Sequence, residues 1–266
     1  MSKELVQQQF GANAAAYLTS TVHAKGASLA RLVDLVKPDR GWVVLDIATG
    51  AGHTAAAFAP HVARVVASDL TPEMLEQARK LASQKGLANM ETAIADAEQL
   101  PFAAQTFDLV TCRIAPHHFP NVGKFLGEAF RVLKLGGVFA LVDNVSPDTE
   151  TNPGYSPAEL HEAAATYNAF EKLRDPSHAR ALTTLEWLEL IGKAGFRLRH
   201  VEHAPKAMDF GSWVKTMNVP SDTIPRLRAM LERASPALRS FLRPAEVDGR
   251  LGFMLDELIA IAQKPV

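Results

Sequence analysis

The stretch LDIATGAGHTA, residues 45–55, decides the interpretation of this sequence. It contains the end of WVVLDIA (42–48), a short, β-branched, apolar run that is typical of a strand buried on both faces of a parallel sheet. Two closely spaced glycines, Gly50 and Gly52, follow and lead into the small-residue helix GHTAAAFA (52–59). A strand that turns through glycines into a helix is typical of a nucleotide-binding unit, so we expect a ligand at the end of this strand.

Strands and helices alternate along the chain after this stretch. Further apolar runs predict strands at VARVVASD (62–69), NMETAIAD (89–96), FDLVTCRI (107–114) and VFALVDNV (138–145). Helices are predicted between them, the best marked having Thr71 as N-cap, Pro72 at its first position and Gly86 as its stop. This alternation argues for right-handed βαβ crossovers. We therefore predict the α/β class, with a Rossmann-like doubly wound, mostly parallel sheet.

Four segments make up the predicted organisation of the chain. They are an N-terminal helical cap segment (1–40), a Rossmann-like cofactor-binding core (41–205), a helical lid insert (206–247) and a C-terminal element that completes the core (248–266). FRLRHVEH, from residue 196, is predicted to be a sixth strand, whereas the apolar residues after 250 fit either a strand or a helix. The insert fits a cover over the ligand pocket or an oligomer contact, and the sequence leaves both open.

Composition and charge limit the class of protein. The chain has 266 residues, of which 47% are hydrophobic, and a formal net charge of −1, which does not suggest a nucleic-acid partner. No apolar stretch approaches the roughly 20 residues of a membrane span, and MSKELVQQQF (1–10) lacks the apolar core of a signal peptide. The single cysteine, Cys112, excludes an intramolecular disulfide framework. We expect a cytoplasmic protein, monomeric or homodimeric, with no nucleic-acid or membrane partner.

The spacing of the glycines leaves two nucleotide cofactors open. Gly50, Gly52 and Ala55 satisfy the G-x-G-x-x-G/A fingerprint of dinucleotide folds. Asp69 follows at about the usual distance of the acid that binds the ribose. On spacing alone, NAD therefore remains possible.

The charge at the turn distinguishes the two cofactors. NAD presents a pyrophosphate to the glycine turn, whereas S-adenosylmethionine presents a sulfonium cation and an ammonium group but no phosphate. Asp46, just before the glycines, repels the first and attracts the second. At about 4 Å and an effective dielectric near 20, a favourable pair is worth roughly 4 kcal/mol before desolvation. Asp96, at the end of the third predicted strand, points the same way because a carboxylate can accept a hydrogen bond from the adenine amino group.

The stretch around these acids resembles the class I S-adenosylmethionine-dependent methyltransferases, most closely the small bacterial group similar to ubiquinone/menaquinone-biosynthesis methyltransferases. The first motif of that family, acid-x-Gly-x-Gly-x-Gly, is matched by Asp46, Ala48, Gly50 and Gly52, with alanine in place of the first glycine. RVLKLGG, before the fifth predicted strand, matches the family's RVLKPGG with leucine in place of proline. The resemblance is strong over residues 7–145 and weak over the remainder.

The resemblance implies S-adenosylmethionine as the cofactor and a set of residues that contact it. It implies that Asp69 holds both ribose hydroxyls. Tyr17 is the best candidate in the N-terminal segment that closes over the methionine end, although packing within the first helix also explains it. The backbone of Arg113 and Ile114 is expected to border the cofactor. The full set of expected contacts is Tyr17, Asp46, Ala48, Gly50, Gly52, Asp69, Leu70, Met74, Asp96, Ala97, Glu98, Arg113 and Ile114.

Three histidines are candidates for a catalytic base. Methyl transfer needs alignment more than acid catalysis, because a sulfonium is already an activated donor, and a base is required only if the acceptor carries a proton. His118 and His117 follow the fourth predicted strand, and His178 lies in RDPSH. Histidine can take a proton near neutral pH, although a loop histidine without a chemical role is the alternative for each. Together with His23 and His53 they match no zinc spacing, so no metal site is predicted.

We therefore expect an enzyme that transfers a methyl group from S-adenosylmethionine to a small organic acceptor and releases S-adenosylhomocysteine. Two alternatives stay open: an NAD-dependent oxidoreductase, which the glycine spacing allows, and a noncatalytic S-adenosylmethionine-binding protein. Fold and donor do not determine the acceptor, so neither its identity nor the atom that receives the methyl group follows from the sequence.

Overall fold

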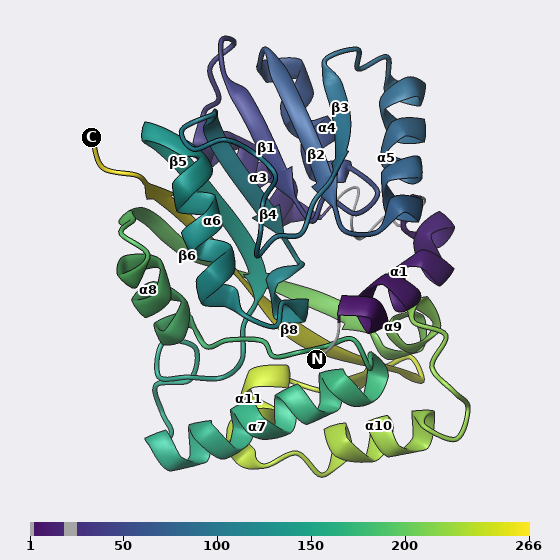
Figure 1. Ribbon diagram of the computed structural model, residues 1–266. Coiled ribbons are helices and arrows are strands. Elements are labelled where there is room, and N and C mark those ends of the chain that lie inside the picture. The colour runs from purple at the N-terminus through teal and green to yellow at the C-terminus, as the bar shows by residue number, and fades with distance from the viewer. Residues whose placement is uncertain (1–2, 19–25) are drawn as a thin grey trace.

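A mixed sheet forms the frame of the molecule. The computed structural model describes residues 3–18 and 26–266. Its strands are β1 (Val43–Ile47), β2 (Arg64–Asp69), β3 (Met90–Ile94), β4 (Phe107–Arg113), β5 (Leu133–Asn144), β6 (Arg197–Asp209), β7 (Ala245–Val247) and β8 (Arg250–Gln263). The strand order is β3-β2-β1-β4-β5-β8-β6, with β7 paired to β8 (Figure 1). Neighbours from β3 to β5 run parallel, whereas β8 is antiparallel to both β5 and β6, which confirms the predicted α/β class.

The strand order reverses beside β1, and this reversal positions a ligand site. The chain builds from β1 to β2 and β3 on one side, then returns to form β4 and β5 on the other. The ends of β1 and β2 lie side by side because Ile47 is in register with Ser68. In open sheets of this kind, ligands bind outside the carboxyl ends of the strands at such a reversal.

Helices cover both faces of the sheet. They are α1 (Lys3–Leu18), α3 (Ala27–Val36), α4 (His53–Phe58), α5 (Pro72–Lys85), α6 (Val122–Val132), α7 (Pro157–Arg174), α8 (Thr184–Lys193), α9 (Phe210–Thr216), α10 (Ile224–Glu232) and α11 (Pro236–Leu242), with short 3-10 helices η1 (Ala59–His61) and η2 (Pro116–His118). The apolar sides of α3, α4 and α5 pack on one face, and those of α6 and α8 pack on the other. No helix of the described chain has the length and apolarity to cross a membrane.

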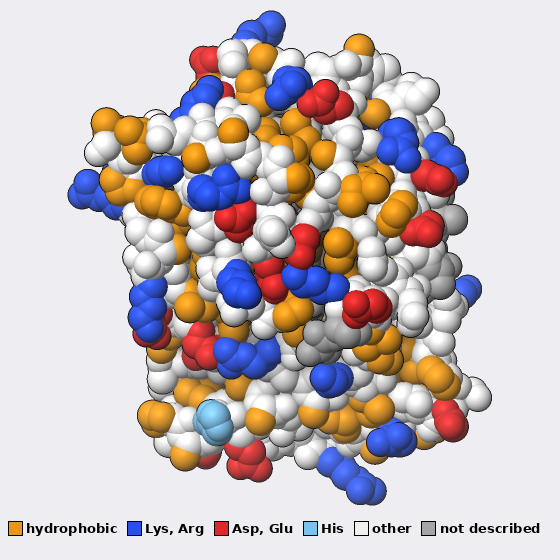
Figure 2. Space-filling model, viewed as in Figure 1, with side chains coloured by type: hydrophobic (Ala, Val, Ile, Leu, Met, Phe, Trp, Pro, Cys, Tyr) orange, Lys and Arg blue, Asp and Glu red, His pale blue; other side chains and the backbone are white. Residues whose placement is uncertain are grey.

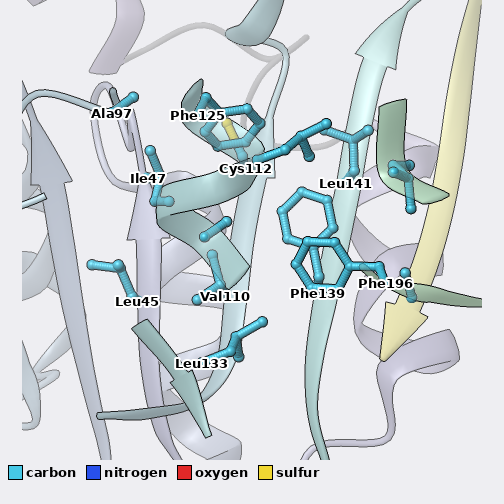
Figure 3. Packing of buried hydrophobic residues seen from close by; sticks show 14 of the residues in the cluster. Leu45, Ile47, Ala97, Val110, Cys112, Phe125, Leu133, Phe139, Leu141 and Phe196 are labelled. Carbon is cyan, nitrogen blue, oxygen red and sulfur yellow. The ribbon is translucent and has the colours of Figure 1, made fainter. Parts of the chain in front are cut away.

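The core beneath α6 and α8 contains stacked aromatic side chains (Figure 3). Phe139 of β5 stacks on Phe196 with ring centroids 5.0 Å apart, and Phe125 of α6 lies 6.0 Å from Phe139. Cys112 of β4 is fully buried in the same cluster. Close packing of this kind resists displacement, so it holds the end of β4 firmly in place.

Four helices form a separate layer, which we call the helical cap: α7, α9, α10 and α11. Figure 1 shows α7, α10 and α11 gathered below the sheet. Their contact surface is a third apolar cluster, in which Phe170 stacks on Trp213 with ring centroids 4.7 Å apart. α7 belongs to this layer although it precedes the predicted insert (206–247), and β6 runs through Asp209 into that insert. The cap therefore draws on chain segments from both sides of β6.

Besides β7, which lies at the end of the predicted helical insert (206–247), two elements of the sheet were not defined by the sequence pattern. The C-terminal run, for which strand and helix were both open, is β8, a strand of 14 residues whose second half is buried on both sides. An interior strand of this kind lacks the alternation that marks a half-exposed one. β5 begins at Leu133 rather than at Val138, because Gly136, with φ +74°, carries the chain through an irregularity opposite β4.

Candidate functional site

A pocket opens at the reversal point, between the carboxyl ends of β1, β2 and β4 and the helix α1. The empty space in this region, open solvent included, is about 1020 Å³. In Figure 1, α1 lies between α5 and the helical cap. The lining residues are Lys3, Val6, Phe10, Ala48, Thr49, Gly50, Ala51, His53, Thr54, Asp69, Leu70, Thr71, Met74, Ala95, Asp96, Ala97, Glu98, Arg113, Ile114, Ala115, His118, Phe119 and Pro120.

Most of the residues predicted from sequence lie in this wall. Those that line it are Ala48, Gly50, Asp69, Leu70, Met74, Asp96, Ala97, Glu98, Arg113, Ile114 and His118. Asp46, Gly52, His117 and His178 lie outside the lining. The side chain of Tyr17, in α1, and the whole of His23 are outside the part of the chain that the structure describes.

The two motif glycines face different neighbours. Gly50 has φ +55°, and an added Cβ would meet no atom within 4 Å, so its backbone borders open space in the pocket wall. Gly52 has φ +85°, and an added Cβ would lie 2.8 Å from Met90 Cε and 2.9 Å from Ala78 Cβ. Residues with a Cβ rarely adopt either conformation. Gly50 therefore lets a ligand approach the backbone, whereas Gly52 lets the turn pack closely against its neighbours.

Asp46 lies behind the glycine turn. It is buried and accepts hydrogen bonds from Thr49 Oγ1 at 2.5 Å, Thr111 Oγ1 at 2.6 Å and the backbone N–H of Ala55 at 3.1 Å. Burial raises the pKa of Asp46 to about 6, against the opposing effect of these hydrogen bonds. The sequence led us to expect this carboxylate to face the cofactor; in the structure it shapes the turn that carries Gly50.

Asp69, at the end of β2, faces the pocket and also holds the turn. Its Oδ2 accepts the backbone N–H of Gly50 at 2.9 Å, and its Oδ1 accepts that of Thr71 at 2.9 Å. Burial raises the pKa of Asp69 above its ordinary value, and these N–H groups oppose the shift. Each carboxylate oxygen has a second lone pair, so Asp69 can accept further hydrogen bonds from the hydroxyls of a ligand.

An ion-pair cluster ties α1 to the wall of the pocket. Lys3 Nζ lies 2.6 Å from Asp96 Oδ2 and 2.9 Å from Glu98 Oε2. One turn later, Gln7 donates from Nε2 to the carbonyl oxygen of Leu70 at 2.9 Å. Figure 2, which has the same view as Figure 1, shows acidic and basic side chains interspersed on this face. Lys3 therefore pairs with two acids that belong to the set of expected cofactor contacts.

Two non-glycine residues in the wall have left-handed backbone conformations. Ala48 has φ 51° and Ile114 has φ 54°. Ala48 stands where the family motif has glycine, which adopts such angles readily. Ile114 is β-branched, and for such a residue a positive φ is a genuine outlier. Strain of this kind costs roughly 1–3 kcal/mol per residue and clusters at functional sites, so its position here supports the assignment of the pocket.

His118, in η2, is the one predicted catalytic histidine that lines the pocket. Its Nδ1 lies 2.9 Å from the carbonyl oxygen of Ser177, which can only accept, so Nδ1 carries the proton and Nε2 the lone pair. Asp175 Oδ2 is 4.0 Å from Nε2, and the Phe10 ring of α1 packs edge-on with its centroid 4.9 Å away. Burial, followed by the charge of neighbouring His117, lowers the pKa of His118 to about 3, so the ring is neutral.

His117 and His178 lie behind His118, with ring centroids 4.2 Å and 6.4 Å from it. His117 Nδ1 is 2.6 Å from Asp143 Oδ1; burial alone would lower the pKa of His117, but this carboxylate raises it above the ordinary value. His178 Nε2 is 2.9 Å from Asn168 Oδ1, and burial lowers the pKa of His178 to about 2. Among the described residues, no group of three or more His, Cys, Asp or Glu side chains is arranged to hold a metal ion.

The wall formed by α1 was only partly foreseen. The N-terminal segment is expected from the sequence to close over the cofactor through Tyr17. In the described part of α1, the residues that line the pocket are Lys3, Val6 and Phe10. Val6 and Phe10 are four residues apart, a spacing that places both on one side of a helix. That apolar pair was the available signal in the sequence.

Comparison with known proteins relates the core to one family. Residues 45–141 match the methyltransferase domain family. YcgJ of Bacillus subtilis, named as an uncharacterized methyltransferase, is 35% identical over 230 residues, which are 86% of this chain and 87% of that protein. The ubiquinone/menaquinone biosynthesis C-methyltransferase UbiE of Brucella anthropi is 38% identical over 45% of this chain and 46% of its own length.

Two solved structures are similar over nine-tenths of the chain. A candidate methyltransferase from Bacillus halodurans C-125 is 38% identical, with a TM-score of 0.82 over 91% of this chain and 100% of that one. The structure of YcgJ from Bacillus subtilis is 32% identical, with a TM-score of 0.81 over 90% of this chain and 98% of that one. The similarity therefore extends beyond the domain match into most of the helical cap.

Proposed function

This chain belongs to the class I S-adenosylmethionine-dependent methyltransferases, and we propose that it methylates a small organic acceptor with S-adenosylmethionine as donor, releasing S-adenosylhomocysteine. Its methyltransferase activity follows from the family. The donor and the kind of acceptor are the proposal. The observation that carries it is one pocket wall at the strand reversal: the Gly50 N–H, 2.9 Å from Asp69 Oδ2, lies in it beside the further carboxylates of Asp96 and Glu98.

The pocket wall suits an adenosyl donor without phosphates. Asp69 can accept hydrogen bonds from ribose hydroxyls and Asp96 from an adenine amino group, while Gly50 leaves the backbone accessible. Leu70 and Met74 offer apolar surface to a flat base. When bound, the donor supplies a methyl group on a sulfonium, whose sulfur keeps the bonding electrons as the methyl group leaves. The wall holds more carboxylates than the two cations Lys3 and Arg113, and this excess of negative charge disfavours a pyrophosphate.

The acceptor in this proposal lies at the end of the pocket formed by Phe10, His118, Phe119 and Pro120. This end suits a small, largely apolar molecule whose reacting atom carries a proton. Neutral His118 accepts a hydrogen bond from that group at Nε2 and so orients it. Its low pKa means that the proton transfers only when the new bond to carbon has made it acidic. Asp175, 4.0 Å away, then stabilises the imidazolium until the proton passes to water.

In the proposed enzyme, α1 and the helical cap cover the pocket. α1 contributes Lys3, Val6 and Phe10 to the wall, and the loop after cap helix α7 holds His118 through the carbonyl of Ser177. We infer that α1 and the helical cap exclude water from the acceptor end, as lids commonly do. The buried thiol Cys112 fits a reducing compartment, and we propose that the protein acts in the cytoplasm as a monomer or a homodimer.

The two alternatives have less support. An NAD-dependent oxidoreductase rested on the spacing of the glycines, and neither the matching family nor the relatives described above bear that activity in their names. A noncatalytic binding protein would require no oriented, neutral histidine beside the pocket. Ligand titration and methyl-transfer assays distinguish both alternatives from the proposed function.

Calorimetric titration of the purified chain tests the donor. We expect S-adenosylhomocysteine to bind with a micromolar dissociation constant and NAD at least about a hundredfold more weakly, a difference of about 2.7 kcal/mol. Comparable binding of NAD, or no binding of S-adenosylhomocysteine, contradicts the proposal. Transfer of labelled methyl groups to a panel of phenols, thiols, quinones and amines then identifies the acceptor class. Donor binding with uniform inactivity on the panel would favour the noncatalytic alternative.

A further inference from the structure

A buried ion pair lies next to His118, on the side away from the pocket lining. The proposed reaction does not use it. Asp143, at the end of β5, and His117, in η2, meet with Oδ1 and Nδ1 2.6 Å apart, and both side chains are buried. The other carboxylate oxygen of Asp143, Oδ2, has no hydrogen-bond partner among the described residues. Such pairs add little stability, because the cost of desolvation offsets the attraction. Their position beside the pocket therefore indicates a role other than stability.

The ion pair is in direct contact with the candidate base. The His117 ring lies 4.2 Å, centroid to centroid, from the His118 ring. On the same ring, Phe10 packs edge-on and the Ser177 carbonyl oxygen lies 2.9 Å from Nδ1. Ser177 Oγ lies 3.3 Å from the same Nδ1, and Asp175 Oδ2 lies 4.0 Å from Nε2. Of these neighbours, only His117 is part of the buried ion pair.

Charged and titratable groups from several elements bear on the two histidines. They are Asp143 of β5, Glu171 and Arg174 of α7, and Asp175 and His178 of the following loop, while Cys112 of β4 and Tyr167 of α7 interact with Asp143 itself. Asp143 has the largest effect among those that favour a proton on His117. The charge of His117, in turn, disfavours a proton on His118. The influence therefore passes from Asp143 to His117 and from His117 to His118.

We propose that Asp143 is a positioning residue for methyl transfer: through His117 it adds to burial in keeping His118 uncharged, and it fixes the orientation of the His118 ring at the acceptor end of the pocket. The inference rests on the proposed function for its effect on rate. The charge and orientation of His118, however, are properties of the free protein and can be measured without donor or acceptor.

Simple electrostatics connects the three side chains. The Asp143 carboxylate favours a proton on His117 against the effect of burial, and positive charge on a ring 4.2 Å away opposes a proton on His118. The Ser177 carbonyl oxygen accepts a hydrogen bond from Nδ1–H of His118, so Nε2 is the one ring nitrogen where a proton from the acceptor can arrive. A ring that is neutral, of one tautomer and held in place can orient the acceptor at every turnover.

Nuclear magnetic resonance of the histidine rings tests this proposal in the full chain. Asp143→Asn keeps the volume of the side chain but removes its charge. We expect His117 to lose its proton at a lower pH than in the wild type, and His118 to take one up at a higher pH. The nitrogen-15 shifts of each ring report both changes.

A second histidine–aspartate pair offers a matched control. His203 Nδ1 lies 2.9 Å from Asp256 Oδ2, and hydrogen bonding to that carboxylate raises the pKa of His203. Asp256→Asn should therefore shift the titration of His203 and leave His117 and His118 unchanged. An equal effect of Asp256→Asn on His118 would overturn the proposal, because a general loss of negative charge would then explain the result.

The pH dependence of kcat distinguishes a positioning role of Asp143 from a purely structural one. Since a protonated His118 cannot accept a hydrogen bond at Nε2, Asp143→Asn should move the acid-side fall of kcat to a higher pH than in the wild type. The KM for the donor should change by less than about twofold, because the change lies at the acceptor end. Failure of the wild type to transfer methyl groups would contradict the proposed function and leave the resonance result intact.

A double variant keeps the proposal testable if Asp143→Asn alone fails to fold. Asp143→Asn combined with His117→Gln replaces the ion pair by two amides, and exchange of a buried pair for uncharged groups is commonly tolerated. His118 should again take up its proton at a higher pH than in the wild type. Unchanged titration of His118 in both the single and the double variant overturns the proposal.

Discussion

Asp69 and Gly50, at the ends of successive strands, are joined by a hydrogen bond of 2.9 Å from the backbone N–H of the glycine to Oδ2 of the acid. The bond spans the gap between β1 and β2 and holds the glycine turn against the second strand. The same carboxylate lines the pocket. Substitutions at these two positions should therefore act on ligand binding before they act on the fold.

Asp69→Asn should weaken the binding of S-adenosylhomocysteine about tenfold to a hundredfold. A hydrogen bond to a charged group is worth about 1.5–3 kcal/mol, and each 1.4 kcal/mol is about tenfold in affinity. Calorimetric titration measures the loss. Asp108→Asn is the matched control, because Asp108 binds Lys134 Nζ and the backbone N–H of Val43 and does not line the pocket. Equal affinity of Asp69→Asn and the wild type would show that Asp69 does not bind the ligand.

Gly50→Ala and Gly52→Ala should separate binding from stability. At Gly50 the new Cβ enters open space in the pocket wall, so ligand affinity should fall while strain costs about 1 kcal/mol. At Gly52 the Cβ must also displace Ala78 and Met90, so unfolding should become easier by about 2–4 kcal/mol. Thermal unfolding of both variants shows which one loses more stability, and ligand titration shows which one loses more affinity. A larger loss of stability at Gly50 than at Gly52 would contradict this reading of the turn.

The pH dependence of stability should reveal the buried Asp46. Burial raises its pKa from 3.8 to about 6, so the folded state binds this proton more tightly than the unfolded chain does. The stability that this group contributes is present below about pH 4 and is lost as the pH rises through about 6. At about 1.4 kcal/mol per pKa unit, the loss is about 3 kcal/mol.

Asp46→Asn cannot titrate and so removes this dependence. Its free energy of unfolding, relative to that of the wild type, should rise by about 3 kcal/mol between pH 4 and pH 7. Urea unfolding at several pH values measures the difference, and other groups cancel because both proteins contain them. A difference that stays constant with pH would show that Asp46 has an ordinary pKa.

His118→Asn should lower kcat about a hundredfold to ten-thousandfold if the acceptor loses a proton during transfer. Binding of S-adenosylhomocysteine should change little, because the residues proposed to contact the donor lie elsewhere in the wall. His161→Asn, at an exposed position of α7, controls for the loss of a histidine. An unchanged kcat in His118→Asn would mean that the acceptor has no proton to lose or passes it elsewhere.

Tyr167→Phe should leave stability unchanged or raise it by up to about 1 kcal/mol. The Tyr167 hydroxyl is buried and has no hydrogen-bond partner within the described ranges, so its removal relieves a desolvated polar group. Tyr155→Phe is the control, because its hydroxyl donates to the Pro236 carbonyl at 3.0 Å, and that bond would be lost. A loss of more than about 1 kcal/mol in Tyr167→Phe would show that the hydroxyl has a partner.

The parallel part of the sheet could be predicted because each of its strands is a local apolar run that ends in turn residues. β8 could not, because the apolar residues of its second half face protein on both sides and carry no period of two. Its place between β5 and β6 depends on pairing between distant residues such as Val138 and Gln263. Membership of α7 in the helical cap likewise depends on contacts with helices that follow β6.

The sequence by itself determined the glycine turn, the acids at the strand ends and the histidines near the fourth strand, since each is a short pattern set by backbone geometry and residue chemistry. Only the tertiary structure decided which of these groups face the pocket. It placed Asp46 behind the turn and His118 in the wall, and it joined His117 to Asp143 and Lys3 to Asp96. Such contacts link the ends of different elements, and the order of the strands, not the local pattern, brings those ends together.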